Sequence, residues 1–173
     1  MNKRAYFATG CFWGAERRFW NLPGVMSTAV GYMGGITDHP SYKEVCTGKT
    51  LHAETVEVNY DSEKISYQRL LEEFWTMHDP TSLNKQGGDI GTQYRSAIFT
   101  TDSEQMLAAV NTREIYNDEL LRNGMGEIVT EIQEASPHHF WPAEEYHQRY
   151  LEKNPDGYDC HSSTGVPFPK VSQ

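Results

Sequence analysis

The order of strand-forming and helix-forming segments is the feature that most constrains the fold of this chain of 173 residues. Five segments have the composition of strands, at residues 4–9, 25–32, 52–60, 96–100 and 127–133. Four have that of helices, at residues 11–21, 66–78, 101–122 and 143–153. Strands and helices alternate, except that the second and third strands follow one another directly. This order favours an α+β fold over a doubly wound parallel sheet. We expect a two-layer α/β sandwich with a ferredoxin-like core and a mixed sheet.

Local patterns define the helices and the tail. Within residues 66–78 the apolar residues recur at the spacing of one buried helical stripe, namely Tyr67, Leu70, Leu71, Phe74 and Trp75. Thr101 and Glu104 have the spacing of a capping box and predict the start of the helix that ends near Arg122. Beyond residue 155 Gly, Ser, Pro and Thr predominate, which indicates an irregular tail. We therefore expect a single domain over residues 1–155 and an irregular C-terminal tail over residues 156–173.

The chain is acidic, because 15 Lys and Arg residues against 24 Asp and Glu residues give a net charge of −9. Such a field repels nucleic-acid phosphates and anionic lipid headgroups, so we expect neither nucleic acid nor membrane as a partner. No run approaches the ~18 apolar residues that a membrane-spanning helix requires. Together with the size of the chain, these features predict a soluble monomer.

The three cysteines, Cys11, Cys46 and Cys160, are widely spaced and form no Cys-x-x-Cys pair. An odd number at such spacing is typical of reduced thiols in a reducing compartment, rather than of a secreted disulfide framework. We therefore expect a cytoplasmic protein. The sequence implies no acidic or basic partner for Cys46, which we interpret as structural.

Cys11 is the first candidate for chemistry. It lies between the end of a predicted strand and the start of a predicted helix, flanked by Gly10 and Gly14. The positive end of a helix stabilises a thiolate, and glycines allow a reactant to approach closely. The alternative is a small buried apolar residue, which describes most lone cysteines. Position alone leaves these two interpretations about equally supported.

Glu54 is the second candidate. The alternation along residues 52–60 puts it on the same face as Val56, Val58 and Tyr60. If that face is the core face, desolvation raises the pKa of the carboxyl group and keeps it protonated as a potential acid. The alternative is that the strand begins one residue later and Glu54 enters solvent. Periodicity alone somewhat favours the alternative.

A glycine-rich stretch, residues 87–95, carries Asp89, Tyr94 and Arg95. It does not match a phosphate-binding loop, because no Gly-Lys-Ser/Thr follows and no helix begins there. Loops of this composition often carry functional residues, although most are only connections. By itself the stretch is a weak candidate.

The histidines do not form a recognisable metal site. His138, His139, His147 and the Cys160–His161 pair have no spacing typical of zinc ligands. Two adjacent histidines cannot easily direct both rings at one ion. We therefore expect no metal.

Taken together, these segments resemble one family. Residues 10–14, Gly-Cys-Phe-Trp-Gly, are similar to the signature of the A-type methionine sulfoxide reductases, the peptide-methionine (S)-S-oxide reductases. The string is specific because it places Cys and Trp, two rare residues, between two glycines. Further segments resemble the family in the same order, at residues 31–35, 42–48, 52–54, 78–81, 91–96 and 143–148. The resemblance extends over about residues 5–160.

The resemblance implies an enzyme that reduces the S-epimer of methionine sulfoxide, free or in proteins, to methionine. On this reading the Cys11 thiolate attacks the sulfoxide sulfur and Glu54 protonates the oxygen. The family's other site residues fall on Tyr42 and Tyr94, which bind the oxygen, on Asp89, which supports them, and on Phe12 and Trp13, which form the socket for the methyl group.

The resemblance also implies a redox cycle without a bound cofactor. Cys11 becomes a sulfenic acid, a second thiol condenses with it into a disulfide, and thioredoxin reduces that disulfide. Family members often have Gly-Tyr-Cys in the C-terminal region, whereas this chain has Gly157-Tyr158-Asp159-Cys160. We therefore expect Cys160 in the tail to be the resolving cysteine of a two-cysteine cycle. The chain has no length for a fused B-type reductase domain, so we expect no activity on the R-epimer.

Two other classes of function remain open. Cys11 with His147 or His139 suggests a Cys-His thiol hydrolase, although that leaves Glu54 without a role and names no residue to orient the histidine. A non-catalytic thiol sensor would oxidise at Cys11 without accepting sulfoxides. Hydrolysis of an ester without reductant favours the first class, and stoichiometric oxidation by peroxide without turnover favours the second.

Overall fold

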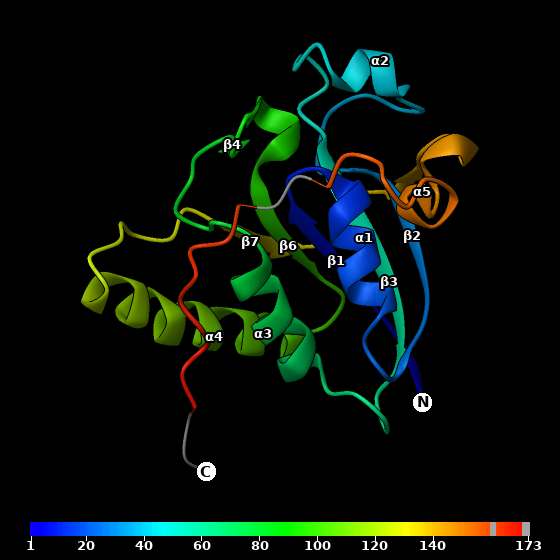
Figure 1. The fold of residues 1–173 in the computed structure, drawn as a ribbon. Helices are drawn as coiled ribbons and strands as arrows, with labels where there is room; N and C mark the ends of the chain where they lie inside the picture. The colour runs from blue at the N-terminus through cyan, green and yellow to red at the C-terminus, as the bar shows by residue number, and fades with distance from the viewer. Residues whose placement is uncertain (160–161, 171–173) are drawn as a thin grey trace.

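A six-stranded sheet forms the centre of the computed structural model, which describes residues 1–159 and 162–170 (Figure 1). Its strands are β1 (Asn2–Thr9), β2 (Val25–Met33), β3 (Ala53–Asp61), β6 (Ser96–Thr100), β7 (Glu131–Glu134) and β8 (Trp141–Pro142). They lie in the order β7-β6-β1-β3-β2-β8, and only the pair β6–β7 is parallel. The four inner strands and the helices between them have the ferredoxin-like arrangement, so the predicted fold class and mixed sheet are confirmed.

Three helices cover one face of this sheet: α1 (Phe12–Trp20), α3 (Tyr67–Met77) and α4 (Ser103–Arg122) (Figure 1). The remaining elements are short. They are α2 (Tyr42–Val45), α5 (Tyr150–Lys153), the 3₁₀ turns η1 (Thr92–Tyr94) and η2 (Glu145–His147), and a separate hairpin of β4 (Lys85–Gln86) and β5 (Asp89–Ile90).

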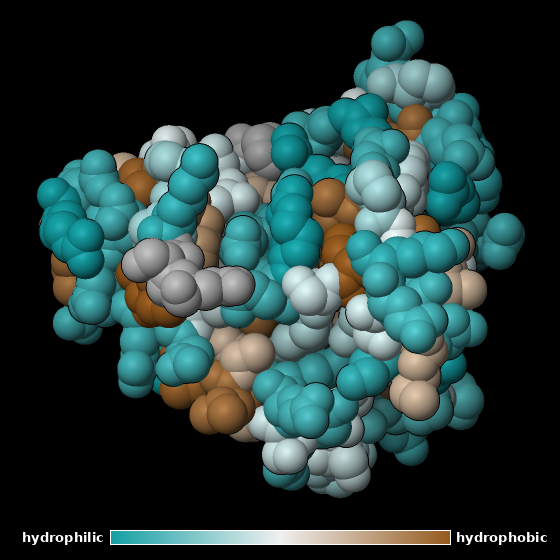
Figure 2. Space-filling model, turned by 90° about the horizontal axis from the view of Figure 1, so that it is seen from below, coloured by the Kyte–Doolittle hydropathy of each residue, from teal (hydrophilic) through white to brown (hydrophobic). Residues whose placement is uncertain are grey.

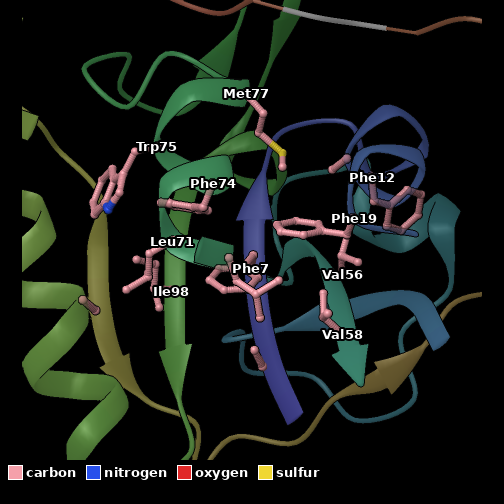
Figure 3. Packing of buried hydrophobic residues seen from close by; sticks show 14 of the residues in the cluster. Phe7, Phe12, Phe19, Val56, Val58, Leu71, Phe74, Trp75, Met77 and Ile98 are labelled. Atoms are coloured by element: carbon pink, nitrogen blue, oxygen red, sulfur yellow. The ribbon is translucent and has the colours of Figure 1, made fainter. Parts of the chain in front are cut away.

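The main core lies between the sheet and these helices. Phe7 of β1 is stacked on Phe19 of α1, with ring centroids 5.0 Å apart, and lies 5.4 Å from Phe74 of α3 (Figure 3). All three rings are fully buried. Burying a side chain of this size contributes about 1.5–3 kcal/mol, so the aromatic contacts fix α1 and α3 on β1. A smaller cluster, including Tyr6 and Phe99, occupies the opposite face beneath Phe140.

The surface seen from below in Figure 2 is largely hydrophilic, with hydrophobic residues in small separate groups. Among residues 1–159 and 162–170, no helix is long and apolar enough to cross a membrane. Residues 162–170 contain no helix or strand, as expected for the tail. They nevertheless pack on α4, because Tyr116 donates a hydrogen bond to the carbonyl of Val166 at 2.6 Å and stacks on Phe168.

The prediction of a helix over residues 143–153 was wrong. Arg149 adopts the left-handed conformation, with φ of 50°, and separates η2 from the short α5. Its N–H donates to the buried carboxylate of Glu16 at 2.7 Å. The side chain of Gln148 bonds both the N–H and the carbonyl of Val30, each at 2.8 Å. These bonds to distant residues outweigh the helical propensity of the segment.

Two elements also begin at other residues than predicted. The cap of α4 is Asp102, whose carboxylate accepts the N–H of Gln105 at 2.8 Å, and not Thr101 with Glu104. Asp102 is the better acceptor because it is charged and lies at the positive helix end. The last long strand begins at Glu131 rather than at residue 127, since only residues 131–134 pair with β6.

Candidate active site

Cys11 is held at the junction between β1 and α1. Gly10 precedes it with φ of 105°, a conformation that favours glycine, and a Cβ at this position would lie 2.8 Å from the side chain of Gln86. Cys11 itself is the N-cap of α1 and is half-buried. The strand-to-helix turn therefore places its sulfur at the positive end of α1, as the sequence predicts.

A cavity of about 100 Å³ adjoins Cys11 and brings together side chains from distant parts of the chain. It is lined by Cys11, Phe12, Trp13, Tyr42, Glu54, Asp89, Tyr94 and Tyr158. All the predicted site residues except Cys160 are among them, and Cys160 lies outside the described residues. Larger hollows of about 570 and 510 Å³ lie at the start of α4 and beside Phe140, and the residues that line them include no member of this set.

Glu54 lies on the core face of β3, with only 2% of its surface exposed. One carboxyl oxygen accepts the N–H of Phe12 at 3.1 Å, and the other is buried with no hydrogen-bond partner in the described part of the chain. Burial raises the pKa of Glu54 to about 8; the Phe12 N–H opposes this shift and the charge of Asp89 adds to it. Glu54 is therefore protonated at neutral pH and has one oxygen left to act on a bound molecule.

Two tyrosines line the cavity from separate short elements. Tyr42 begins α2, which the sequence analysis did not predict although Ser41 and Glu44 form its capping box. Tyr94 ends η1. Burial, together with the nearby carboxyl of Glu54, raises the pKa of both phenols above the ordinary value. Both hydroxyl groups thus remain protonated donors at neutral pH.

The apolar wall of the cavity depends on a residue that the site predictions missed. The indole N–H of Trp13 donates to Nδ1 of His147 at 3.0 Å, and the indole is stacked on Tyr150 with centroids 3.8 Å apart. Because Trp is only a donor, Nδ1 carries no proton and the ring proton is on Nε2. Burial lowers the pKa of His147, which keeps the ring in this neutral form. His147 thus fixes the orientation of Trp13.

The start of the tail also reaches the cavity. The hydroxyl of Tyr158 donates to both carboxylate oxygens of Asp89 at 3.3 Å. Asp159 forms an ion pair with Arg17 of α1. Ser162 lines a second small cavity together with Cys11. The sequence departs here from Gly-Tyr-Cys by one additional residue, Asp159, and this is the residue that pairs with Arg17.

Comparison with known proteins identifies the family of this chain. A family model described as peptide methionine sulfoxide reductase matches residues 3–171. The chain belongs to this family. The peptide methionine sulfoxide reductase MsrA of Salinispora arenicola is 54% identical over 167 residues, which is 95% of this chain and 75% of that protein.

Solved structures of the family share the fold. Methionine sulfoxide reductase A of Corynebacterium diphtheriae has a TM-score of 0.88 and 44% identity, and the match covers 98% of this chain and 84% of that one. Mxr1 of Saccharomyces cerevisiae in its reduced form has a TM-score of 0.84 and 37% identity, over 94% of this chain and 92% of that one. The same protein in complex with Trx2 has a TM-score of 0.59 and 20% identity, over 94% and 89% of the two chains.

Cys46 lies closer to the site of this reductase than the sequence indicates. It follows α2, is exposed, and its thiol lies near the hydroxyl of Tyr42. Burial and the nearby Glu54 raise the pKa of the Cys46 thiol, and the neighbouring Tyr42 hydroxyl only partly offsets them. At neutral pH Cys46 is therefore mainly the thiol, which is a poor nucleophile.

Among the residues that the structure describes, the other titratable side chains give no sign of a metal centre. Within residues 1–159 and 162–170, no three His, Cys, Asp or Glu side chains are grouped so that they could hold an ion. His138 and His139 line the hollow beside Phe140, apart from the Cys11 cavity.

Proposed function

We propose that Cys11 carries out the reaction of this family, the reduction of methionine sulfoxide to methionine, on the S-epimer of the free or protein-bound residue. One observation carries the assignment of roles. Glu54, which is protonated and has one oxygen without a hydrogen-bond partner in the described part of the chain, lines the same cavity of about 100 Å³ as Cys11. Cys11 can therefore act as a nucleophile on the sulfur of a bound sulfoxide while Glu54 acts as an acid on its oxygen.

In the first step the Cys11 thiolate attacks the sulfoxide sulfur while Glu54 gives its proton to the oxygen. Tyr42 and Tyr94 donate hydrogen bonds to the same oxygen and stabilise the charge that develops as the S–O bond breaks. The S–S bond formed by this attack then breaks as the hydroxyl group moves from the substrate sulfur to the Cys11 sulfur, so methionine leaves and Cys11 becomes a sulfenic acid. Two electrons have then passed from Cys11 to the substrate sulfur.

The shape of the cavity supports selection of one epimer. A sulfoxide sulfur carries an oxygen, a methyl group and a longer chain in a fixed chirality. Phe12 and Trp13 offer an apolar wall for the methyl group, and three donors from Glu54, Tyr42 and Tyr94 bind the oxygen. The mirror image would direct its methyl group at these donors and leave them without acceptors, which costs about 1–3 kcal/mol for each buried group.

We assign the resolving step to Cys160. Its thiol attacks the Cys11 sulfenic acid, a disulfide forms, and the oxygen leaves as water. The anchored neighbours of Cys160 support this role, because Tyr158 is tied to Asp89, Asp159 to Arg17, and Ser162 lies at a cavity with Cys11. Cys46 is less suited to this attack on the sulfenic acid, because its thiol is poorly ionised at neutral pH.

An external dithiol must then reduce the Cys11–Cys160 disulfide, and we propose thioredoxin, since the yeast relative Mxr1 was solved in complex with Trx2. The cycle needs no prosthetic group, and the reducing cytoplasm suits it. The catalytic domain corresponds to residues 1–155, and residues 156–173 form the tail that delivers Cys160.

The arrangement gives little support to a thiol hydrolase. His147 uses Nδ1 to accept the Trp13 indole N–H, and His139 lies at a different hollow from Cys11. Neither histidine lines the Cys11 cavity, whereas Glu54 does.

The two sulfoxide epimers test the proposed function. With thioredoxin or a small dithiol as reductant, the protein should convert the S-epimer of N-acetylated methionine sulfoxide to the sulfide and leave the R-epimer intact. Chiral chromatography of the remaining substrate measures the amount of each epimer. Equal consumption of the two epimers, or ester hydrolysis without any reductant, would contradict the proposal.

The pair formed by Arg17 and Asp159 should affect only the resolving step. Both side chains are part-exposed, at 35% and 25%, so a contribution of about 1 kcal/mol or less is expected. Arg17→Gln should therefore slow disulfide closure by about twofold to fivefold and leave the first formation of methionine unchanged. Quenched-flow thiol counting separates the two steps.

The double variant Arg17→Asp with Asp159→Arg exchanges the two charges and should restore closure. Arg69→Gln, which breaks an exposed pair with Glu73, is the matched control and should leave both steps unchanged. Closure at the wild-type rate in Arg17→Gln would show that the ion pair has no part in resolution.

A further inference from the structure

Glu144 links two elements of the site but does not line the cavity. It lies between β8 and η2, and its half-buried carboxylate is bonded through both oxygens. Oε1 accepts the hydroxyl of Tyr32 in β2 at 2.9 Å. Oε2 accepts the backbone N–H of Tyr42 in α2 at 2.9 Å. One side chain thus joins the central sheet to the first residue of α2.

The attachment matters because α2 is a single turn. The first N–H groups of a helix have no partner inside it, and a helix of four residues is not stable by itself. Its position must come from tertiary contacts. The Glu144 carboxylate supplies a charged acceptor for the N–H of Tyr42, and a negative charge is favourable at this helix end.

The other end of the link lies in the core. Tyr32 is fully buried, is the register partner of Glu54 on β3, and its ring lies 5.8 Å from that of Phe12. Glu144 therefore connects the backbone of Tyr42 to the paired strands β2 and β3, and β3 carries the acid Glu54. The ring of His147, from the same segment, lies 4.5 Å from the ring of Tyr42 and adds a second contact.

Glu144 carries the charge that this link requires. Its burial opposes ionisation, but the hydrogen bonds from Tyr42 and Tyr32 outweigh that effect and lower the pKa of Glu144 below its ordinary value. The carboxylate is thus ionised at neutral pH and accepts both bonds.

We propose that Glu144 is a positioning residue for Tyr42, which holds the phenol hydroxyl at the place where the sulfoxide oxygen binds. This inference rests on the proposed function, in which Tyr42 donates to that oxygen. Misplacement of a catalytic group by about 1 Å costs on the order of 10²-fold in rate. A residue that sets the backbone of Tyr42 can therefore control the reaction without touching substrate.

A double-mutant cycle tests the proposal. Glu144→Gln keeps the shape of the side chain, but its amide has one acceptor oxygen and cannot satisfy both donors. We expect the maximal rate constant for methionine formation in a single turnover, which we call kcat, to fall about 10- to 100-fold, as for loss of a charged hydrogen bond. The half-saturating substrate concentration, which we call KM, should be nearly unchanged. Tyr42→Phe should cause a similar fall, and Glu144→Gln should add little to it.

The cycle distinguishes positioning from a general loss of structure. If the losses in the double variant add fully, or if Glu144→Gln has wild-type kcat, Glu144 does not act through Tyr42 and the proposal is overturned. If Tyr42→Phe alone is silent, both the proposal and the donor role of Tyr42 fail, although reduction through Cys11 and Glu54 stands.

The control variant changes the residue that follows Glu144 in the sequence. Glu145→Gln removes the same charge from the adjacent residue, whose side chain is 92% exposed, and should leave kcat and KM unchanged. Thermal unfolding and near-UV circular dichroism confirm that each variant is folded. If Glu144→Gln does not fold, Glu144→Asp, which retains the charge on a shorter side chain, enters the same cycle with the same criteria.

Discussion

Replacement of Glu54 by glutamine should lower the rate of sulfoxide reduction by about 10²- to 10⁴-fold, the usual contribution of a general acid, while substrate binding changes little. The amide is nearly isosteric and can still accept the N–H of Phe12, so the local structure should persist. It has no proton to transfer to the leaving oxygen. Single-turnover formation of methionine and a binding assay with substrate measure the two effects separately.

The dependence on pH gives this prediction a second readout. The pKa of Glu54 is raised to about 8, so the acid form is present below that pH and is lost above it. The wild-type rate should therefore fall about tenfold for each pH unit above 8, and this limb should be missing in Glu54→Gln. Because Cys11 must also be a thiolate, the apparent pKa values in the pH profile belong to Cys11 and Glu54 as a coupled pair.

Glu57→Gln is the matched control, since Glu57 lies on the same strand but on the other face of the sheet. It should keep the wild-type rate and pH profile. A wild-type rate in Glu54→Gln, or an unchanged rate across this pH range, would remove Glu54 from the acid role.

The second large effect is expected from Cys160→Ser. This variant should form one methionine per protein molecule and then stop, because the Cys11 sulfenic acid has no thiol to resolve it. Steady-state turnover with thioredoxin should fall to background. Cys11→Ser, in contrast, should form no methionine at all, even in the first turnover.

A trapping reagent for sulfenic acids distinguishes the outcomes. Cys160→Ser should accumulate the modified Cys11 after one turnover, whereas the wild-type protein should not. Continued turnover of Cys160→Ser with thioredoxin at the wild-type rate would show that another route, through Cys46 or directly through the sulfenic acid, resolves the enzyme.

The sequence predicts the parts of the fold that local patterns determine. The direct step from residues 25–32 to 52–60 and the apolar stripe of 66–78 led to the observed sheet and to α3. Residues 143–153 were predicted wrongly because bonds to Glu16 and Val30, more than 100 positions away, dictate their conformation. Helical propensity contains no information about such contacts.

The same distinction applies to the site. The position of Cys11 and the parity of Glu54 can be read from neighbouring residues, and the resemblance to a family supplied the two tyrosines. The contacts of His147, Glu144 and Tyr158 at the site were not predicted, because each is bonded to a partner far along the chain, namely Trp13, Tyr42 and Asp89. A search for buried polar groups and their partners would find them only once the fold is known.

The central claim is that Cys11 reduces the sulfoxide and Cys160 closes the cycle. Fully reduced protein should be mixed with the S-epimer of methionine sulfoxide in the absence of any reductant, and its intact mass and peptides mapped. We predict one methionine per chain, the loss of two hydrogen atoms from the protein, and a disulfide that joins Cys11 to Cys160. A disulfide to Cys46, or methionine release without any disulfide, would contradict the account.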